Sequence, residues 1–341
     1  MIVTLREVAL KAGVSRSAVS RTFTPGASVS AKTRAKVELA AEELGYRPSV
    51  LASALSTGRT KLIGLVSTNF RNPIFLEVFD HFTKALQARA LRPLLVNLSG
   101  EMTLESAVGM LRQYSVDGVI LASSTLPPSF PLAFKAAGLP VVHCFGRWSK
   151  DPEVNLVGID NRACGRMAAE TLLTRGYQRI GFLGGPATAT STEDRLAGFR
   201  EALAGPGRAQ LTTSFADSYS FDAGFQEMSR LIAEGDLAEA YFCGDDVLAI
   251  GAMSALRAAG MNVPEDIGIL GLNDMEMAGW PGTQLTTIHQ PIDAIVAAGV
   301  ERIVSLLENP DQPPLAQLYD CQVVERGTLR ARAPHDRVIG T

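Results

Sequence analysis

The stretch RIGFLGGPATATSTEDRLAGFREALAG, residues 179–205, contains a short apolar run, a loop rich in Gly and Thr, and an amphipathic segment. Residues 179–185 are typical of a buried strand, which appears in a sequence as an apolar run of about four to eight residues. Within residues 194–205 the apolar positions recur at helical spacing. The stretch therefore predicts a strand, a loop and a helix, in that order.

The same alternation continues through the chain from residue 61. Strands that alternate with helices predict parallel sheets covered by helices on both faces. The number of apolar runs favours two doubly wound parallel sheets, and therefore two subdomains in one α/β core. Further apolar runs lie at 62–67, 93–98, 118–123, 140–145, 240–244 and 267–272, and further helical segments lie at 75–90, 163–176, 247–260 and 294–309.

The N-terminal segment differs from the rest of the chain in charge. Residues 1–60 contain nine Lys and Arg and four Glu, a balance of +5. The other 281 residues contain 23 basic and 31 acidic groups, a balance of −8, which agrees with the net charge of −3. A basic segment on an acidic protein indicates that its partner is an anionic polymer.

The basic segment is predicted to begin with three short helices. Thr4, Ser15 and Ser30 are suited to be their N-caps, because Ser and Thr side chains accept hydrogen bonds from the free amides at a helix start. Gly13 provides a tight turn between the first two helices, and Gly45 ends the third. Two helices joined by such a turn form the helix-turn-helix arrangement, whose second helix lies in the DNA major groove.

The second helix is expected to contact DNA. Arg16, Ser17 and Ala18 lie at its leading edge, and Arg21 follows on the same face. Arginine can donate two hydrogen bonds to a guanine, whereas hydroxyl groups that bind phosphates position the helix without reading the sequence. The expected DNA contacts of the head are Thr4, Ser15, Arg16, Ser17, Ala18, Ser20 and Arg21.

The next segment, PSVLASALSTG at residues 48–58, begins with Pro, ends with Gly and has no charge. About eight helical residues are too few to be stable alone in water, and a flexible linker would be more polar. We therefore expect residues 48–60 to form a helix only in contact with a partner.

Polar side chains follow several of the predicted strands, at the edge where open parallel sheets bind ligands. Carboxylates, amides and one arginine, with aromatic side chains near them, suit a small ligand with several hydroxyl groups. The candidate residues are Phe75, Asp160, Arg195, Asp245, Asp246, Asn273, Asp274 and Trp280, and the polar loop STNFRNP at residues 67–73 follows the first strand at the same edge.

The sequence gives little support for catalysis. It contains no GxGxxG after a strand, no GxxxxGK[ST], no GxSxG and no metal-ligand spacing among its four His and four Cys. The carboxylates could act as a general acid and base, but no activated nucleophile accompanies them. We expect no enzyme activity, no cofactor and no metal. Without an export signal or an apolar run of about 20 residues, the protein is expected in the cytoplasm with reduced thiols.

The residues resemble those of the lactose/galactose repressor (LacI/GalR) family over nearly the whole chain. The matching motifs are TLREVALKAGVSRSAVSRTF and VSAKTRAKVELAAEELGYRP, followed by NPIF, VDGVIL, VGIDN, RIGFLGGP, DRLAGF, CGDDVLAIGA and LTTIHQP. The resemblance implies a homodimeric transcriptional regulator with a core like a periplasmic sugar-binding protein. The implied division is a helix-turn-helix head at 1–47, a hinge helix at 48–60 and a core at 61–341, with subdomains at 61–160 and 291–318 and at 161–290 and 319–332.

The resemblance also implies roles for single residues. Arg16 and Ser17 match positions that set operator preference, and Leu55 matches the hinge leucine that enters the minor groove and kinks the duplex. Ser53 stands where the family usually has a hinge arginine, and the tail has no leucine heptads, so we expect a dimer and not a tetramer. The implied effector contacts are Phe75, Asp160, Arg195, Tyr219, Asp245, Asn273 and Trp280.

The resulting interpretation is a DNA-binding regulator of a catabolic operon, expected to be a repressor. Two heads bind a near-palindromic operator, and a small effector between the two subdomains controls this binding. A sugar or sugar derivative is the expected effector, with a purine or another small metabolite as the alternative. Two other classes of protein share part of the pattern: a periplasmic sugar-binding protein, which would lack the basic head, and a sugar-metabolising α/β enzyme.

Overall fold

The computed structural model describes residues 3–24, 26–47, 58–98, 103–205 and 209–332. The chain forms two compact units, which are described separately below. The first contains residues 1–61 and 115–117, and the second contains residues 62–114 and 118–341. The hinge segment at 48–57, including Ser53 and Leu55, lies outside the described residues.

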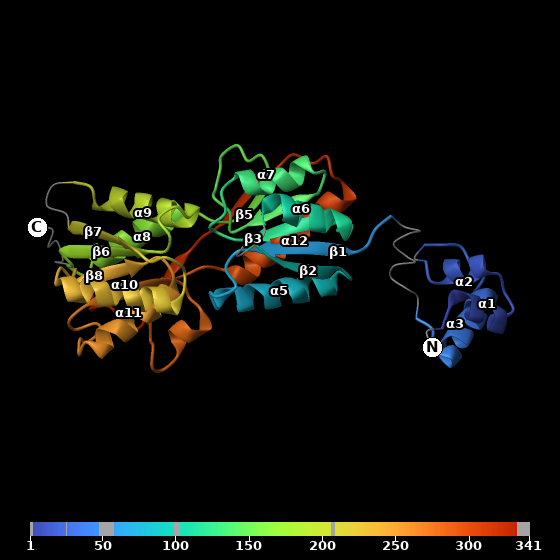
Figure 1. The fold of residues 1–341 in the computed structure, drawn as a ribbon, viewed down its shortest axis with the longest axis horizontal. Coiled ribbons are helices and arrows are strands. Elements are labelled where there is room, and N and C mark those ends of the chain that lie inside the picture. Colours follow the sequence, from blue (N-terminus) through green and yellow to red (C-terminus); the bar gives the residue numbers. More distant parts are fainter. Residues whose placement is uncertain (1–2, 25, 48–57, 99–102, 206–208, 333–341) are drawn as a thin grey trace, which may run out of the picture. The chain divides into compact units, whose positions relative to one another are not determined.

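The first unit contains the three predicted helices, α1 (Leu5–Ala12), α2 (Arg16–Thr22) and α3 (Ala31–Leu44) (Figure 1). The Ser15 hydroxyl accepts a hydrogen bond from the Ala18 amide, and the Ser30 hydroxyl accepts one from the Thr33 amide. Gly13 and Gly45 end α1 and α3 with φ angles of 64° and 67°, which glycine adopts without strain. The small core of this unit consists of Val8, Ala9, Val19, Val37, Ala40 and Ala41.

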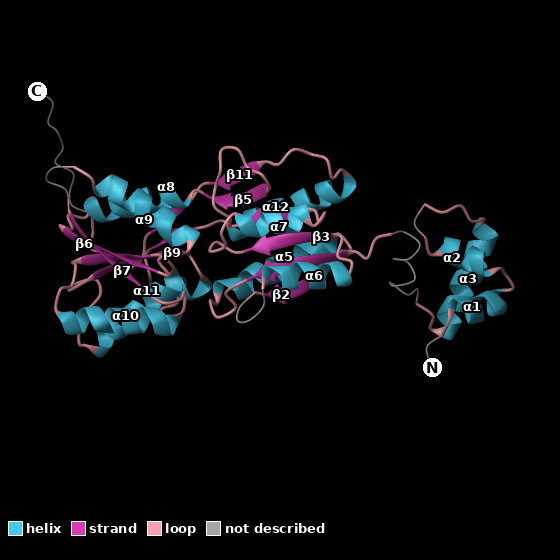
Figure 2. Cartoon of the chain, turned by 45° about the horizontal axis from the view of Figure 1, so that its top comes forward, coloured by secondary structure: helices cyan, strands magenta, loops and turns pink. Residues whose placement is uncertain are grey.

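The second unit contains two six-stranded sheets, and Figure 2 shows helices on both sides of each. The strands of the first sheet are all parallel. Their order is β11 (Ala316–Tyr319), β5 (Asn155–Ile159), β4 (Val141–Cys144), β3 (Gly118–Ala122), β1 (Leu62–Ser67) and β2 (Arg92–Asn97). Helices α5 (Ile74–Ala88) and α12 (Ile292–Glu308) pack against each other, as do α6 (Leu104–Gln113) and α7 (Ser129–Ala136).

The second sheet has the same arrangement except at one edge, where β12 pairs antiparallel with β10. The order is β12 (Gln322–Val324), β10 (Thr287–His289), β9 (Gly268–Asn273), β8 (Ala240–Cys243), β6 (Arg179–Gly184) and β7 (Gln210–Phe215). The covering helices are α8 (Asn161–Leu173), α9 (Thr190–Leu203), α10 (Phe221–Glu234) and α11 (Asp246–Ala258), and a short 3₁₀ helix, η1, spans Glu276–Gly279.

The two predicted sheets are confirmed, but several elements were not predicted, namely β5, β7, β10, β11, β12, α6, α7 and α10. Strands β7, β11 and β12 are mostly half-buried or exposed, so they lack the continuous apolar run of a central strand. Strand β12 runs antiparallel because the chain enters it directly from β11 of the other sheet, without a crossover helix. The chain passes from one sheet to the other at residue 160, at residues 290–291 and at residues 320–321.

Candidate functional site

A pocket with a free volume of about 40 Å³ lies between the two sheets, at the carboxyl ends of their strands. The lining residues come from loops that follow β1, β3, β4, β7, β8 and β10, from the end of β9, and from helices α5 and α9. They are Thr68, Asn69, Asn72, Ile74, Phe75, Val78, Ser124, Thr125, Phe145, Arg195, Tyr219, Asp245, Asn273 and Gln290. Most of the polar groups are amides and hydroxyls, with one carboxylate and one guanidinium.

The carboxylate of Asp245 is surrounded by hydrogen-bond donors. Its Oδ2 accepts from Asn72 Nδ2 at 2.8 Å and from Asn273 Nδ2 at 2.9 Å, while Oδ1 accepts from the Val247 amide at 2.9 Å. Burial raises the pKa of Asp245, and these donors oppose the shift. Asn72 follows β1 of the first sheet, whereas Asp245 follows β8 of the second. The hydrogen bond between them therefore joins the two subdomains, which are called the first and second lobes below.

Arg195 is 4% exposed and is held by two acceptors on neighbouring segments. Its Nε donates to Asn161 Oδ1 at 2.8 Å, and its Nη1 donates to the Gly244 carbonyl oxygen. Within the described part of the chain, Nη2 makes no hydrogen bond. The guanidinium is therefore fixed in orientation, with one nitrogen left to bind an acceptor on a ligand.

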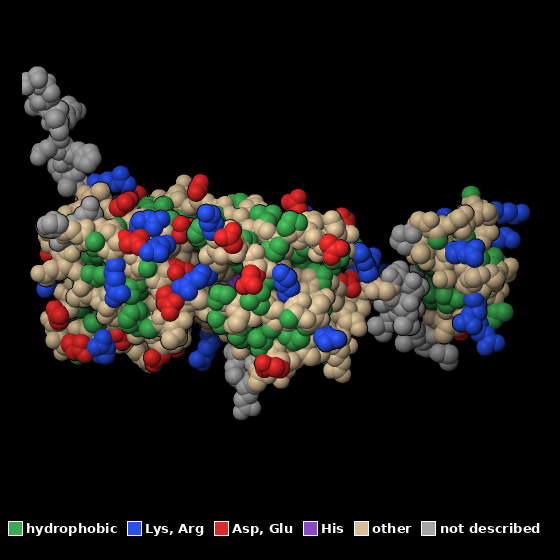
Figure 3. Space-filling view, turned by 90° about the horizontal axis from the view of Figure 1, so that it is seen from above, with side chains coloured by type: hydrophobic (Ala, Val, Ile, Leu, Met, Phe, Trp, Pro, Cys, Tyr) green, Lys and Arg blue, Asp and Glu red, His purple; other side chains and the backbone are tan. Residues whose placement is uncertain are grey.

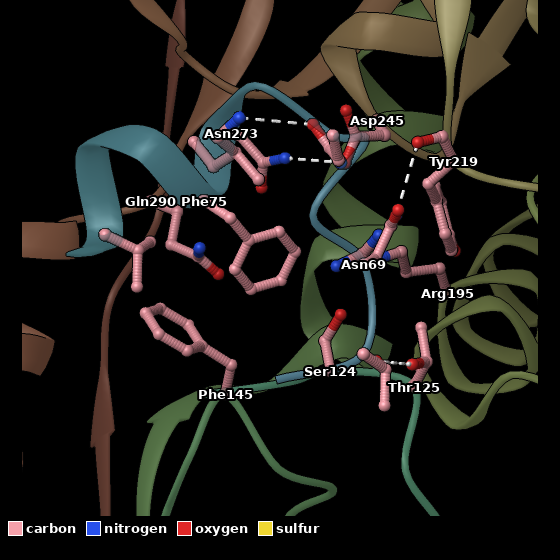
Figure 4. Close-up of a pocket in the computed structure, with 14 residues that line it drawn as sticks. Asn69, Phe75, Ser124, Thr125, Phe145, Arg195, Tyr219, Asp245, Asn273 and Gln290 are labelled. Carbon is pink, nitrogen blue, oxygen red and sulfur yellow. Dashed lines mark hydrogen bonds between the residues drawn. The ribbon is translucent and has the colours of Figure 1, made fainter. Parts of the chain in front are cut away.

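Two phenylalanines form the apolar side of the pocket. Figure 4 shows Phe75 and Phe145 on one side, and Arg195 and Tyr219 on the other. Phe145 directly follows β4 with a φ of 66°, a left-handed conformation that is rare for a bulky side chain. Such conformations persist where the surrounding structure enforces them, and they concentrate at functional sites.

The structure brings together five of the seven expected effector residues, namely Phe75, Arg195, Tyr219, Asp245 and Asn273. Asp160 and Trp280 do not line the pocket. The Asp160 side chain accepts hydrogen bonds from the Arg162 and Ala163 amides and so caps α8. Trp280 follows η1 and is 53% exposed. Asp160 follows a strand, as expected, but its carboxylate is turned toward the first amides of α8.

Several lining residues were not named individually as candidates, although the loop at residues 67–73 was expected at this edge. Asn69 and Asn72 belong to the loop STNFRNP after β1, and Gln290 follows β10. The Asn69 side chain donates to the Tyr219 carbonyl oxygen at 3.2 Å, across the two lobes. Their signal in the sequence was the position of each amide just after an apolar strand, a signal that many loop residues share.

Asp246, beside the pocket residue Asp245, has a structural role. It is fully buried, accepts a hydrogen bond from the Met275 amide at 2.8 Å and accepts one from the Thr287 hydroxyl at 2.6 Å. Burial is the main cause that raises its pKa to about 7, and the charge of Asp245 adds to the shift.

We expect the raised pKa of Asp246 to make the unfolding free energy depend on pH. The folded protein keeps the proton up to about pH 7, whereas the unfolded chain loses it near the ordinary value of about 4. The contribution of Asp246 to the unfolding free energy is therefore fully present below about pH 4 and is lost as the pH rises through about 7. Relative to Asp246→Asn, the unfolding free energy of the wild-type protein should increase by about 2 kcal/mol when the pH is lowered from 7 to 5, as measured by urea unfolding. Parallel curves for the two proteins would contradict the assignment.

The proposed DNA-contacting residues differ in solvent exposure and in the hydrogen bonds that their side chains already form. Arg16, Ser17, Ser20 and Arg21 are exposed, and Ala18 is half-buried. The Thr4 hydroxyl donates to the Glu7 carboxylate, and Ser15 Oγ lies 2.9 Å from Ser17 Oγ while it caps α2.

The basic residues of the head also differ in whether they form ion pairs. Lys11 and Arg34 are paired with Glu43 and Glu38, whereas Arg16 and Arg21 form no ion pair with any described residue. On the face drawn in Figure 3, the described atoms of the head show Lys and Arg but no Asp or Glu, while the core shows both signs.

The described residues contain no group of three or more His, Cys, Asp and Glu that could hold a metal ion. No helix in the same residues is both long and apolar enough to span a bilayer.

Comparison with known proteins decides the family. Residues 4–49 match the family described as bacterial regulatory proteins, lacI family, and residues 169–329 match a periplasmic binding protein-like domain. The ribose operon repressor of Escherichia coli (strain K12) is 32% identical over 314 residues, which cover 90% of this chain and 94% of that protein. The chain belongs to the LacI family. This LacI-family protein is therefore a DNA-binding transcriptional regulator with an effector-binding domain, and the expectation that it is not an enzyme is confirmed.

Solved structures agree with this assignment for the LacI-family chain. The lac repressor dimer bound to operator and the anti-inducer ONPF has a TM-score of 0.87 and 28% identity, and the match covers 97% of this chain and all of that one. A complex of the regulator CelR with cellobiose has a TM-score of 0.71 and 29% identity, and the match covers 96% of this chain and 99% of that one.

Proposed function

We propose that this LacI-family chain acts as a homodimeric repressor that binds a near-palindromic operator through residues 1–47 and a small sugar in the pocket between its two lobes. The lac repressor relative is a dimer bound to operator, and the relative CelR binds cellobiose. Two heads related by two-fold symmetry would bind two half-sites of the operator.

In the proposed complex, α2 lies in the major groove of each half-site. Arg16 donates to base edges and Ser17 and Ala18 contact them, while Arg21 extends the contact along the same face. Thr4, Ser15 and Ser20 bind phosphates and position the helix. The hinge at 48–60 brings Leu55 to the minor groove, a proposal that rests on the sequence alone.

The ligand proposed for the pocket is a monosaccharide. The observation that carries this choice is the combination of Phe145, held in a left-handed conformation, with fixed amides around Asp245 and one free nitrogen of Arg195. The aromatic rings suit the C–H face of a sugar, and the amides suit its hydroxyls, which both donate and accept.

Hydrogen bonds across the lobes provide the route to control. Asn72 and Asn69 of the first lobe donate to Asp245 and Tyr219 of the second. A sugar that replaces or adds to these bonds would favour one angle between the lobes. A ligand shifts such an equilibrium only by its difference in affinity for the two states, typically about 1–3 kcal/mol.

Thermal unfolding of the full-length protein tests the ligand class. A monosaccharide at about 100 times its Kd should stabilise the folded state by roughly 2.7 kcal/mol. We expect a rise in Tm of several degrees with at least one pentose or hexose, lost in Phe145→Ala and kept in Trp280→Phe, which alters a residue outside the pocket. A shift with adenine or hypoxanthine and none with any monosaccharide would contradict the proposal.

A further inference from the structure

A second cavity lies in the first lobe, away from the pocket between the lobes. Its free volume is about 260 Å³, and it lies between α7 and the loop that joins β4 to β5. Its lining residues are Leu126, Pro128, Pro131, Leu132, His143, Arg147, Trp148, Ser149, Asp151, Pro152, Glu153, Val154 and Leu156. None of them lines the interlobe pocket.

The cavity has one buried polar side chain, His143, which is 2% exposed. The ring atom Nε2 lies 2.9 Å from the Ser123 carbonyl oxygen. A carbonyl oxygen only accepts, so Nε2 carries the proton and Nδ1 carries a lone pair. Burial is the main cause that lowers the pKa of His143 to about 4, so the ring is neutral at pH 7.

The acceptor Nδ1 is left without a hydrogen bond from the described residues. Gly146 packs against this edge of the ring, because a Cβ at that position would lie 2.5 Å from Nδ1. Among the described residues the one fully buried side-chain polar atom without a partner is Ser67 Oγ, so Nδ1 is not sealed off and a water-sized group can reach it. The cavity therefore favours an occupant that brings an O–H or N–H group.

The other walls are largely apolar and are held in place before any ligand binds. Leu126, Pro131 and Val154 are buried. Arg147 in the loop donates from Nε and Nη2 to the two oxygens of Asp194, each at 2.8 Å, and from Nη2 to Glu193 at 2.8 Å. The ion pairs fix the loop at its start, and Trp148, 48% exposed, lies beside it.

We propose that this cavity is a second small-molecule site, which takes a flat, neutral, largely apolar molecule of one or two rings with one hydroxyl or N–H donor, bound to His143. A volume of 260 Å³ is below that of pockets for drug-sized ligands, which begin near about 300 Å³. The site does not depend on which ligand binds between the lobes.

Fluorescence of the full-length protein tests the proposal, because Trp148 is one of two tryptophans. In a Trp280→Phe background, we expect p-cresol to change the Trp148 emission in a saturable way. The matched probe 4-methylanisole, which has the same ring and no donor, should bind about tenfold more weakly. Saturable binding should be lost in Leu132→Phe, which fills the cavity, and kept in Gln290→Ala, which alters the interlobe pocket.

Three results would overturn the proposal: no saturable change with p-cresol, equal affinities for p-cresol and 4-methylanisole, or unchanged binding in a folded Leu132→Phe variant. The comparison of the two probes uses the unaltered cavity, so it decides the question even if Leu132→Phe does not fold. A failure here leaves the sugar proposal intact, since the lining residues of the two cavities are different.

Discussion

The Arg195→Ala variant should lose the response to the proposed sugar while it keeps nearly all of its operator affinity. In the wild-type protein Nε and Nη1 are held by Asn161 and Gly244, which leaves Nη2 for a ligand oxygen. A hydrogen bond to a charged donor contributes about 1.5–3 kcal/mol, so we expect a loss of roughly ten- to a hundredfold in ligand affinity by titration calorimetry. Operator affinity should change little, because the contacts proposed for DNA belong to the head.

The same substitution also removes two structural hydrogen bonds, so it needs a matched control. Asn161→Ala removes the bond to Arg195 Nε, but Asn161 does not line the pocket. Both variants should lower the Tm, since each leaves a buried polar group without its partner. Only Arg195→Ala should abolish ligand-dependent release or recruitment of operator DNA in a gel-shift titration. An equal loss of response in both variants would mean that Arg195 acts through structure and not through ligand contact.

Replacement of Arg16 by alanine should reduce operator affinity far more than affinity for random DNA. Arg16 is exposed at the start of α2 and forms no ion pair with any described residue, so its guanidinium is free to reach a base edge. One bidentate contact to guanine distinguishes the correct base by about 1–3 kcal/mol. We therefore expect a loss of roughly ten- to a hundredfold on operator DNA in fluorescence anisotropy, and a much smaller loss on DNA of random sequence.

Lys36→Ala is the matched control for Arg16→Ala. Lys36 is an exposed basic residue on α3, so its replacement removes the same charge from the same head. It should weaken binding to operator DNA and to random DNA by similar, modest factors and reduce the salt dependence of binding, as expected when one positive charge is removed from the basic head. If Arg16→Ala and Lys36→Ala lowered operator affinity equally, Arg16 would contribute charge and not sequence recognition.

The helices of the head could be predicted almost completely from local sequence. Ser15, Ser30, Gly13 and Gly45 are where the structure places the caps and turns. A cap acts on amides or carbonyls only a few residues away, so the neighbouring sequence contains all the information that it needs.

The pocket could be predicted only in part. The sequence indicated that polar residues after strands would meet, and five of the seven expected residues do line one pocket. It did not separate Asp160, which caps α8, from Asp245, which caps α11 and also lines the pocket. Both carboxylates follow an apolar run. Their difference depends on which loops of the opposite lobe lie nearby, and no local pattern contains that information.

By itself, the sequence determined the head helices, most of the central strands, five of the helices that cover them and the family of the protein. Hydrophobic spacing and capping act over a few residues, so the neighbouring sequence contains most of the information that they need. Only the tertiary structure decided the order of strands, the antiparallel edge strand β12 and the bond between Asn72 and Asp245, which are 173 residues apart. These features depend on contacts between segments far apart in the chain, because burial and strand pairing are satisfied only when the whole core has assembled.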